Sequence, residues 1–152
     1  MKTLYDPLTR DTVITRVVQL RPDAKPLWGR MTAHQMLCHL SDSFLVCMGE
    51  RAVSPATSFM QRTLVKWLAL YLPMQWPKGV PTRPEVEQGT GGTPPVEFER
   101  DRERLVALVR RFSSDSRDFQ FHPHPVFGSM SDGQWQRWAY LHTDHHLRQF
   151  GV

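Results

Sequence analysis

The chain has 152 residues, of which 40% are hydrophobic and 22% charged, and an apolar share of this size excludes disorder as its main state. Its 2 cysteines are too few for a disulfide scaffold, and it has no run of about 18 uncharged apolar residues that would span a bilayer. The length predicts a single domain over residues 1–152. Because the first residues also lack the apolar core of a signal peptide, we expect a cytoplasmic protein with reduced thiols.

The formal net charge of +4 comes from an excess of arginine that is spread along the chain. The densest charged segment, residues 97–111, carries acidic side chains early and basic ones late, which is typical of a solvent-facing helix. We therefore expect neither nucleic acid nor membrane among its partners. Association with a nucleic acid or a membrane surface, through the basic excess and the stretch 59–76, is the alternative.

The spacing of apolar residues is helical along almost the whole chain. Residues 12–20 form the first predicted helix, with Val13, Val17 and Val18 near one stripe. After a turn rich in proline, Thr32 has the position of an N-cap for a second helix, which Gly49 would end. The inward face of this second helix is expected to carry Ala33, Met36, Leu37, Leu40, Phe44 and Cys47.

The pattern of apolar residues changes twice in the middle of the chain. Residues 58–72 form a third apolar-periodic segment, which ends at Pro73. From about residue 76 to 96 the periodicity disappears and proline and glycine are frequent, which predicts a long irregular loop. This loop is either a lid over a site or a mobile linker.

Two further helices complete the prediction. Residues 97–112 form the fourth helix, and Ser131 to Gln134 have the form of a capping box that opens a last helix running nearly to the C-terminus. A strand signal is limited to residues 119–121. The predicted fold class is therefore all-α, most simply an antiparallel four-helix bundle with a short extra helix and a long Pro/Gly-rich loop.

The last predicted helix carries two histidines one turn apart. At about 100° per residue, His142 and His146 share a face with Trp135 and Trp138, so this face is expected to point into the bundle. Both tryptophans are expected in the core, with an aromatic wall for a substrate as the alternative. Two such imidazoles can bind one metal ion, and His39 on the second helix is the natural third ligand. From spacing alone, hydrogen bonding within the core is an equally open role for these histidines.

Other polar residues have two interpretations each. Asp42, one turn after the second-helix histidine, either orients an imidazole or accepts a proton, or it is a solvated carboxylate. Gln149 either supports a ligand histidine from behind or satisfies a buried amide. His124 reaches the mouth of the site or stabilises a turn. His34 and His145 are expected to be exposed.

The segments around these histidines resemble a known superfamily. The stretch from Trp28 to Asp42, WGRMTAHQMLCHLSD, is similar to the second-helix signature of the DinB-like (YfiT-like) superfamily of metal-dependent proteins. The stretch from His142 to Gln149, HTDHHLRQ, is similar to its closing His-x-x-x-His motif with a nearby glutamine. The block HPVFG at residues 124–128 resembles a branch described only as a domain of unknown function. The similarity covers most of the chain and is weak over residues 52–95.

The resemblance implies an antiparallel bundle in which His39, His142 and His146 hold one divalent metal ion, usually nickel or zinc, in a protein that is commonly a homodimer. Characterised relatives attach low-molecular-weight thiols such as bacillithiol or mycothiol to electrophiles, or isomerise substrates with the help of a thiol. The implied function is thiol transfer or hydrolysis on a small-molecule substrate, with a low-molecular-weight thiol as cosubstrate. The alternative is a non-catalytic, dimeric helical module whose metal site is structural or vestigial.

Overall fold

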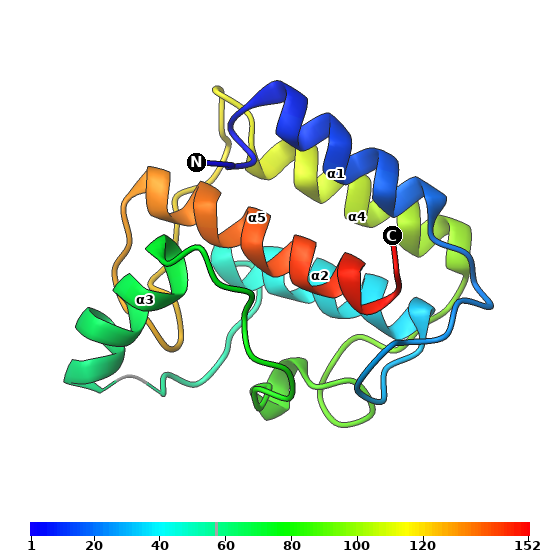
Figure 1. Ribbon diagram of the computed structural model, residues 1–152, viewed down its shortest axis with the longest axis horizontal. Helices are drawn as coiled ribbons and strands as arrows, with labels where there is room; N and C mark the ends of the chain where they lie inside the picture. Colours follow the sequence, from blue (N-terminus) through cyan, green and yellow to red (C-terminus); the bar gives the residue numbers. More distant parts are fainter. Residues whose placement is uncertain (57) are drawn as a thin grey trace.

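The predicted all-helical fold class is confirmed in the computed structural model, which describes residues 1–56 and 58–152 (Figure 1). Its four long helices are α1 (Pro7–Gln19), α2 (Ala33–Cys47), α4 (Phe98–Phe112) and α5 (Asp132–Gln149). A π-helical turn, η1 (Gln61–Val65), leads directly into the short helix α3 (Lys66–Tyr71), and a 3₁₀ turn, η2 (Pro84–Val86), interrupts the long loop.

The long helices pack side by side, with α1 and α2 each contacting both α4 and α5. In Figure 1, α1 and α5 run in one direction, and α2 and α4 run in the opposite one. The pairs α2/α5 and α1/α4 are thus antiparallel, whereas α2/α4 and α1/α5 are parallel. The physical reason is the long connection over residues 48–97, which returns the chain to the end of the molecule where α2 began.

The helix starts follow from their caps. The side chain of Asp6 accepts a hydrogen bond from the Thr9 amide at 2.8 Å and Pro7 occupies the first turn, so α1 begins five residues before the predicted residue 12. Capping boxes at Thr32 and Ser131 open α2 and α5 where the sequence predicted them.

Aromatic side chains fill one end of the core. Phe119 and Phe121, the only predicted strand signal, lie in irregular chain and pack on Phe112, with ring centroids 6.2 and 5.0 Å away. Phe121 also stacks on Trp135 at 5.4 Å. Trp135 and Trp138 are buried in the core as expected, whereas Val18, predicted to lie on the inward stripe of the first helix, is 50% exposed.

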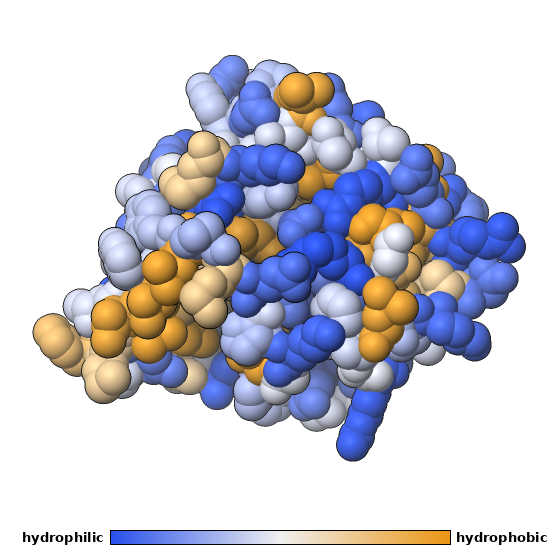
Figure 2. Space-filling model, in the orientation of Figure 1, coloured by the Kyte–Doolittle hydropathy of each residue, from blue (hydrophilic) through white to orange (hydrophobic). Residues whose placement is uncertain are grey.

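The third apolar segment is helical as predicted, but most of its apolar side chains face outward. Leu70 is buried and anchors α3 to the body, where Arg137 Nε donates a hydrogen bond to its carbonyl at 3.1 Å. The exposed side chains, called the α3 face below, form a hydrophobic surface at one end of the molecule (Figure 2). They are Phe59, Met60, Leu64, Val65, Trp67, Leu68 and Tyr71. Among the described residues, no helix combines the length and the apolar character needed to cross a bilayer.

The long loop is tied to the end of α2. Arg51 Nη1 donates to Asp42 Oδ1 at 2.8 Å, and Arg51 Nη2 donates to the carbonyl of Glu85 at 2.9 Å. The amide of Thr93 donates to Asp42 Oδ2 at 2.7 Å. This network holds η2 against α2, so that residues 84–93 form a strap over that helix.

Candidate metal centre

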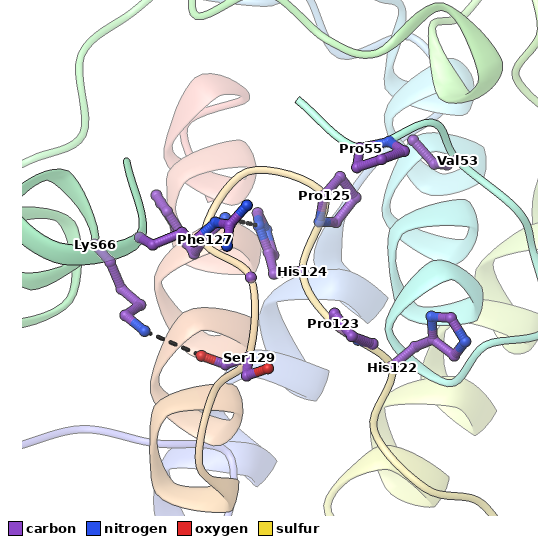
Figure 3. A pocket seen from close by; sticks show the side chains of 11 residues that line it. Val53, Pro55, Lys66, His122, Pro123, His124, Pro125, Phe127 and Ser129 are labelled. Atoms are coloured by element: carbon purple, nitrogen blue, oxygen red, sulfur yellow. Dashed lines mark hydrogen bonds between the residues drawn. The ribbon is translucent and has the colours of Figure 1, made fainter. Parts of the chain in front are cut away.

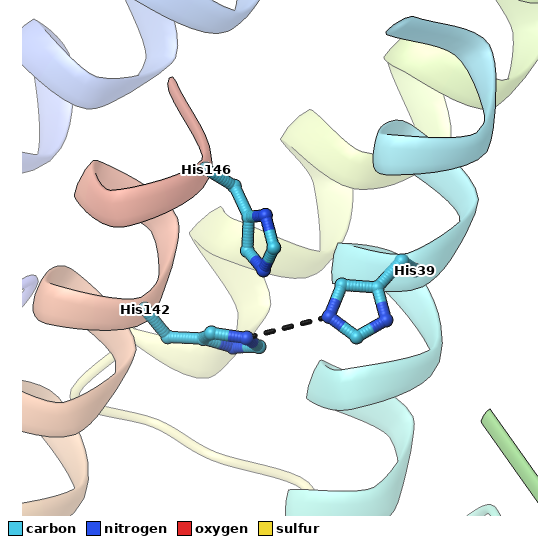
Figure 4. A group of neighbouring side chains, drawn as sticks. All are labelled: His39, His142 and His146. Atoms are coloured by element: carbon cyan, nitrogen blue, oxygen red, sulfur yellow. Dashed lines mark hydrogen bonds between the residues drawn. The ribbon is translucent and has the colours of Figure 1, made fainter. Parts of the chain in front are cut away.

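Three histidines meet between α2 and α5. His39 comes from α2, and His142 and His146 come from successive turns of α5 (Figure 4). Their ring centroids lie 5.3 Å (His39 to His142), 4.8 Å (His39 to His146) and 4.9 Å (His142 to His146) apart, and one nitrogen of each ring lies within 4.8 Å of the others. The structure therefore brings together the three residues that the sequence singled out as ligands.

The spacing of the nitrogens suits a tetrahedral ion. His39 Nε2 and His142 Nε2 are 3.4 Å apart. Two imidazole nitrogens bound to zinc at about 2.0–2.1 Å with a tetrahedral angle lie roughly 3.3–3.4 Å from each other. The pair can accept an ion between them with little movement of either ring.

A hydrogen-bond chain behind His146 assigns its tautomer. Gln149 Nε2 donates to the carbonyl of Trp28 at 2.7 Å, which leaves Gln149 Oε1 to face His146 Nδ1 at 2.9 Å. Because that oxygen can only accept, Nδ1 carries the proton and Nε2 keeps a free lone pair. The backbone of Gly29 allows this approach: a Cβ there would lie 2.7 Å from Gln149 Nε2, and its φ is +80°. Gln149 thus contacts a predicted ligand from behind.

His39 is oriented in the same way by the long loop. Its Nδ1 faces the carbonyl of Val86, in η2, at 3.4 Å. A carbonyl can only accept, so this contact also places the proton on Nδ1 and leaves Nε2 as a lone-pair donor. Two of the three rings consequently present unprotonated nitrogens to the space between the helices.

All three imidazoles are held neutral. Burial lowers the pKa of His39, and burial with the neighbouring histidines lowers the pKa of His142 well below its ordinary value. Burial and the proximity of His39 lower the pKa of His146 to about 3. Neutral imidazole is the form that binds metal, so no proton has to be removed from these rings at pH 7.

Asp42 is fully buried, which excludes the solvated-carboxylate alternative. Its two oxygens accept hydrogen bonds from Arg51 and Thr93 rather than from an imidazole. Asp42 therefore has only an indirect effect on His39: it anchors the strap, and the Val86 carbonyl of the strap faces the His39 ring.

Aromatic rings border the centre on the α5 side. The ring of Trp138 lies 4.8 Å from that of His142, and Trp76, from the long loop, lies 6.0 Å from the same ring. His145 is half-buried rather than exposed, with its ring 5.2 Å from that of His146 and 5.7 Å from that of Trp28.

A separate pocket of about 600 Å³ lies beside the turn at residues 124–128 (Figure 3). Lys66, Phe127 and several prolines line it, and the three clustered histidines do not. His124 Nδ1 accepts hydrogen bonds from the amides of Val126 and Phe127, both at 3.1 Å, which is the turn-stabilising geometry. Its ring lies 5.1 Å from Trp138, so one aromatic layer separates the pocket from the centre.

A second cluster of polar side chains lies on the other side of α2. His34 Nε2 is 2.7 Å from Asp101 Oδ2, and Cys38 Sγ donates to the same oxygen at 3.6 Å. The His34 side chain is 22% exposed rather than fully exposed as predicted. Burial and the charge of Asp101 raise the pKa of Cys38 to about 12, which makes it a poor nucleophile.

Sequence reasoning missed the groups that depend on distant chain segments. The Val86 and Trp28 carbonyls are backbone atoms, so no residue type marks them. The contact between His34 and Asp101 joins residues 67 positions apart. The one usable signal was Gly29 beside Trp28, since a glycine after a large residue can mark a close approach.

One comparison with known proteins gives a match. The model of a family described as "Protein of unknown function (DUF1569)" matches residues 6–151 of the chain. No curated protein and no solved structure matches it.

Proposed function

We propose that this chain, which belongs to the DUF1569 family, is a metal-dependent enzyme of the DinB-like class. In this proposal, His39, His142 and His146 bind one nickel or zinc ion. The enzyme transfers a low-molecular-weight thiol to a small electrophile, or hydrolyses such a molecule. The packing of α1, α2, α4 and α5 around one core is consistent with the bundle that the DinB-like resemblance implies.

One observation carries the proposal: the unprotonated nitrogens of two imidazoles converge on the space that the third also borders. Val86 and Gln149 take the Nδ1 protons of His39 and His146, so both Nε2 lone pairs point into the same space. His142 Nε2, 3.4 Å from His39 Nε2, has at most one proton and can donate to only one of these two lone pairs. A cation between the three rings is a partner for all of them at once.

The chemistry follows from the number of ligands. Three protein ligands leave one position open on a tetrahedral ion, and a water or thiol bound there loses its proton near neutral pH. The strap at residues 84–93 and the Gln149 amide hold two of the rings in place. Trp76 and Trp138 flank His142 and give the centre apolar walls, which favour an apolar electrophile.

The first test is the metal content of tag-free protein, measured by mass spectrometry after refilling with nickel and with zinc. We expect one ion at the triad in the wild type, lost in both His39→Ala and His142→Ala. His122→Ala is the matched control, since His122 is exposed and lies outside the triad. If the triad variants keep the same metal content as the control, the proposed centre is wrong.

The second test separates catalysis from a structural role. Metal-loaded protein is screened for transfer of bacillithiol, mycothiol or cysteine to small electrophiles, and for hydrolysis of the same compounds. Thiol or substrate turnover that disappears in His142→Ala supports the enzyme. A fully loaded triad without turnover favours the non-catalytic module instead.

The exposed α3 face favours a homodimer in either case. An apolar surface of this kind on a soluble protein commonly marks an interaction site, and a second copy is the occupant that we propose. Sedimentation velocity tests this with Trp67→Glu, which should shift the protein to monomer. Val18→Glu is the matched control, because Val18 is 50% exposed against 53% for Trp67 and lies on α1.

A further inference from the structure

We infer that His34, Cys38 and Asp101 form a second divalent-cation site, suited to zinc, between α2 and α4. The three residues combine an imidazole, a thiol and a carboxylate, which are the side chains that zinc prefers. One ligand atom from each lies within 4.8 Å of the others. This site shares no residue with the histidine triad and does not depend on the proposed function.

The helices place the three groups on facing surfaces. His34 and Cys38 are four residues apart, so they lie on the same face of α2, one turn from each other. Asp101 lies in the first turn of α4, which runs parallel to α2, and its side chain reaches across to both. The arrangement is the two-plus-one pattern in which one helix supplies a pair of ligands and its neighbour supplies the third.

The sulfur and oxygen already have the spacing of a bound ion. Cys38 Sγ and Asp101 Oδ2 are 3.6 Å apart. With a bond of about 2.3 Å to sulfur and 2.0–2.2 Å to oxygen, two ligands of tetrahedral zinc lie roughly 3.5–3.6 Å apart. His34 Nε2 is 2.7 Å from the same oxygen and has to move outward by roughly 0.6 Å, so the ion replaces the hydrogen bond between this pair.

Charge balance favours a dication. Zinc binding releases the thiol proton of Cys38 to solvent and leaves a thiolate, a carboxylate and a neutral imidazole around the ion. The two negative charges of the ligands then equal the charge of the cation. The amide of Val96 donates to the same oxygen, Asp101 Oδ2, at 3.1 Å and so helps to fix the orientation of the carboxylate.

The site is reachable from solvent, and it is separate from the triad. The side chains of His34 and Asp101 are 22% and 10% exposed, which gives an ion a path between the helices. Cys38 and His39 are adjacent, but successive residues of a helix point about 100° apart. One of them therefore faces α4, and the other faces α5.

Cobalt(II) spectroscopy tests the site, because only a thiolate ligand gives an intense sulfur-to-cobalt charge-transfer band in the near ultraviolet. The full-length protein is titrated with cobalt(II) alone, and binding of zinc is followed by displacement of the band. We expect the band in the wild type and in His142→Ala, and its loss in Cys38→Ser. Cys47→Ala is the matched control, since Cys47 is the other buried cysteine and lies outside the cluster.

A second readout guards against misfolding of the Cys38 variant. His34→Gln keeps the thiol, and we expect it to weaken cobalt binding at least 10-fold while far-ultraviolet circular dichroism stays unchanged. Zinc stoichiometry should fall by one ion per chain between the wild type and Cys38→Ser. Absence of the band in folded wild type overturns the proposal, as does a band that depends on Cys47. A band in a wild-type protein that binds no metal at the triad supports this site and contradicts the proposed function.

Discussion

The two sides of α2 carry different chemistry on neighbouring residues. Toward α5, His39 meets two more imidazoles; all three rings are neutral, and each offers a nitrogen as its ligand atom. Toward α4, Cys38 and His34 meet a carboxylate that remains charged. Burial raises the pKa of Asp101, but the hydrogen bonds from Val96 and His34 outweigh it and hold that pKa below its ordinary value. Burial and the proximity of the imidazoles to one another thus keep one cluster neutral, whereas hydrogen-bond donors keep the carboxylate of the other ionised.

The two sides would act differently on a bound ion. The α5 side offers lone pairs without any negative charge, so a bound ion keeps its full positive charge and acts strongly on what binds next to it. The α4 side offers two anionic ligands once the thiol is deprotonated, so the charge of a bound ion is balanced and the ion acts less strongly on what binds next to it.

The largest expected effect is the loss of all tightly bound metal in the double variant His142→Ala/Cys38→Ser. Because the two clusters share no ligand, each single variant should lose one ion and the double variant both. Mass spectrometry of the zinc-loaded proteins measures this. A double variant that still holds a full equivalent would show that the ion lies elsewhere.

The next largest effect is expected from the hydrogen bond that orients His146 in the histidine triad. Gln149→Leu removes the acceptor of the His146 Nδ1 proton, and we expect 10–100-fold weaker metal binding at the triad, as is typical when an outer partner is lost. Competition with a chromophoric chelator gives the affinity. Gln136→Leu is the control: Gln136 is also a buried glutamine of α5, but it donates to the Phe112 carbonyl at 2.9 Å. Equal affinities in the two variants would contradict the role of Gln149.

The charge of the α4 side is tested by Asp101→Asn. The carboxylate accepts from Val96, His34 and Cys38, and its loss should lower the free energy of unfolding of the metal-free protein by about 2 kcal/mol. Denaturation in the presence of chelator measures this. Asp132→Asn, in the first turn of α5 with a side chain 66% exposed, should change it by less than about 0.5 kcal/mol.

The smallest expected effect is a pH dependence of stability that comes from His124, in the aromatic layer beside the histidine triad. Burial lowers the pKa of His124 to about 3, so between pH 3 and roughly 6.5 the unfolded chain binds a proton that the folded chain does not. Stability should therefore fall as the pH drops below 6.5, by about 1 kcal/mol at pH 5.5 from this residue.

The variant His124→Asn isolates that contribution, because an asparagine oxygen can accept from the same two amides without titrating. We expect a shallower decline of stability between pH 7 and 5 in the metal-free variant. Parallel curves for the variant and the wild type would mean that His124 does not contribute.

Local patterns were sufficient for most of the helices and for the three histidines that meet between α2 and α5. Capping residues such as Thr32 and Ser131 are adjacent to the turns they stabilise, so the starts of α2 and α5 could be predicted within a residue. The start of α1 was missed because Asp6 and Pro7 precede the apolar pattern. The strand signal at residues 119–121 was wrong because alternating phenylalanines also suit an aromatic core contact.

The orientation of the third segment could not be predicted from its pattern. An amphipathic helix has an apolar face whether that face meets the core or remains at the surface, and only Leu70 of the segment is buried. The same limit applies to Asp42, whose buried partners Arg51 and Thr93 come from a loop without periodicity.

The all-helical class and the shared face of His142 and His146 could be predicted from the residues alone, because both depend on helical periodicity over a few turns. The directions of α2 and α4, the tautomers of His39 and His146, and the contact of Cys38 with Asp101 became visible only in the folded chain. Those features depend on contacts between residues far apart in the chain. Some of these contacts are made by backbone carbonyls, which the residue type does not reveal. The packing of the helices therefore determines which of the candidate side chains come together.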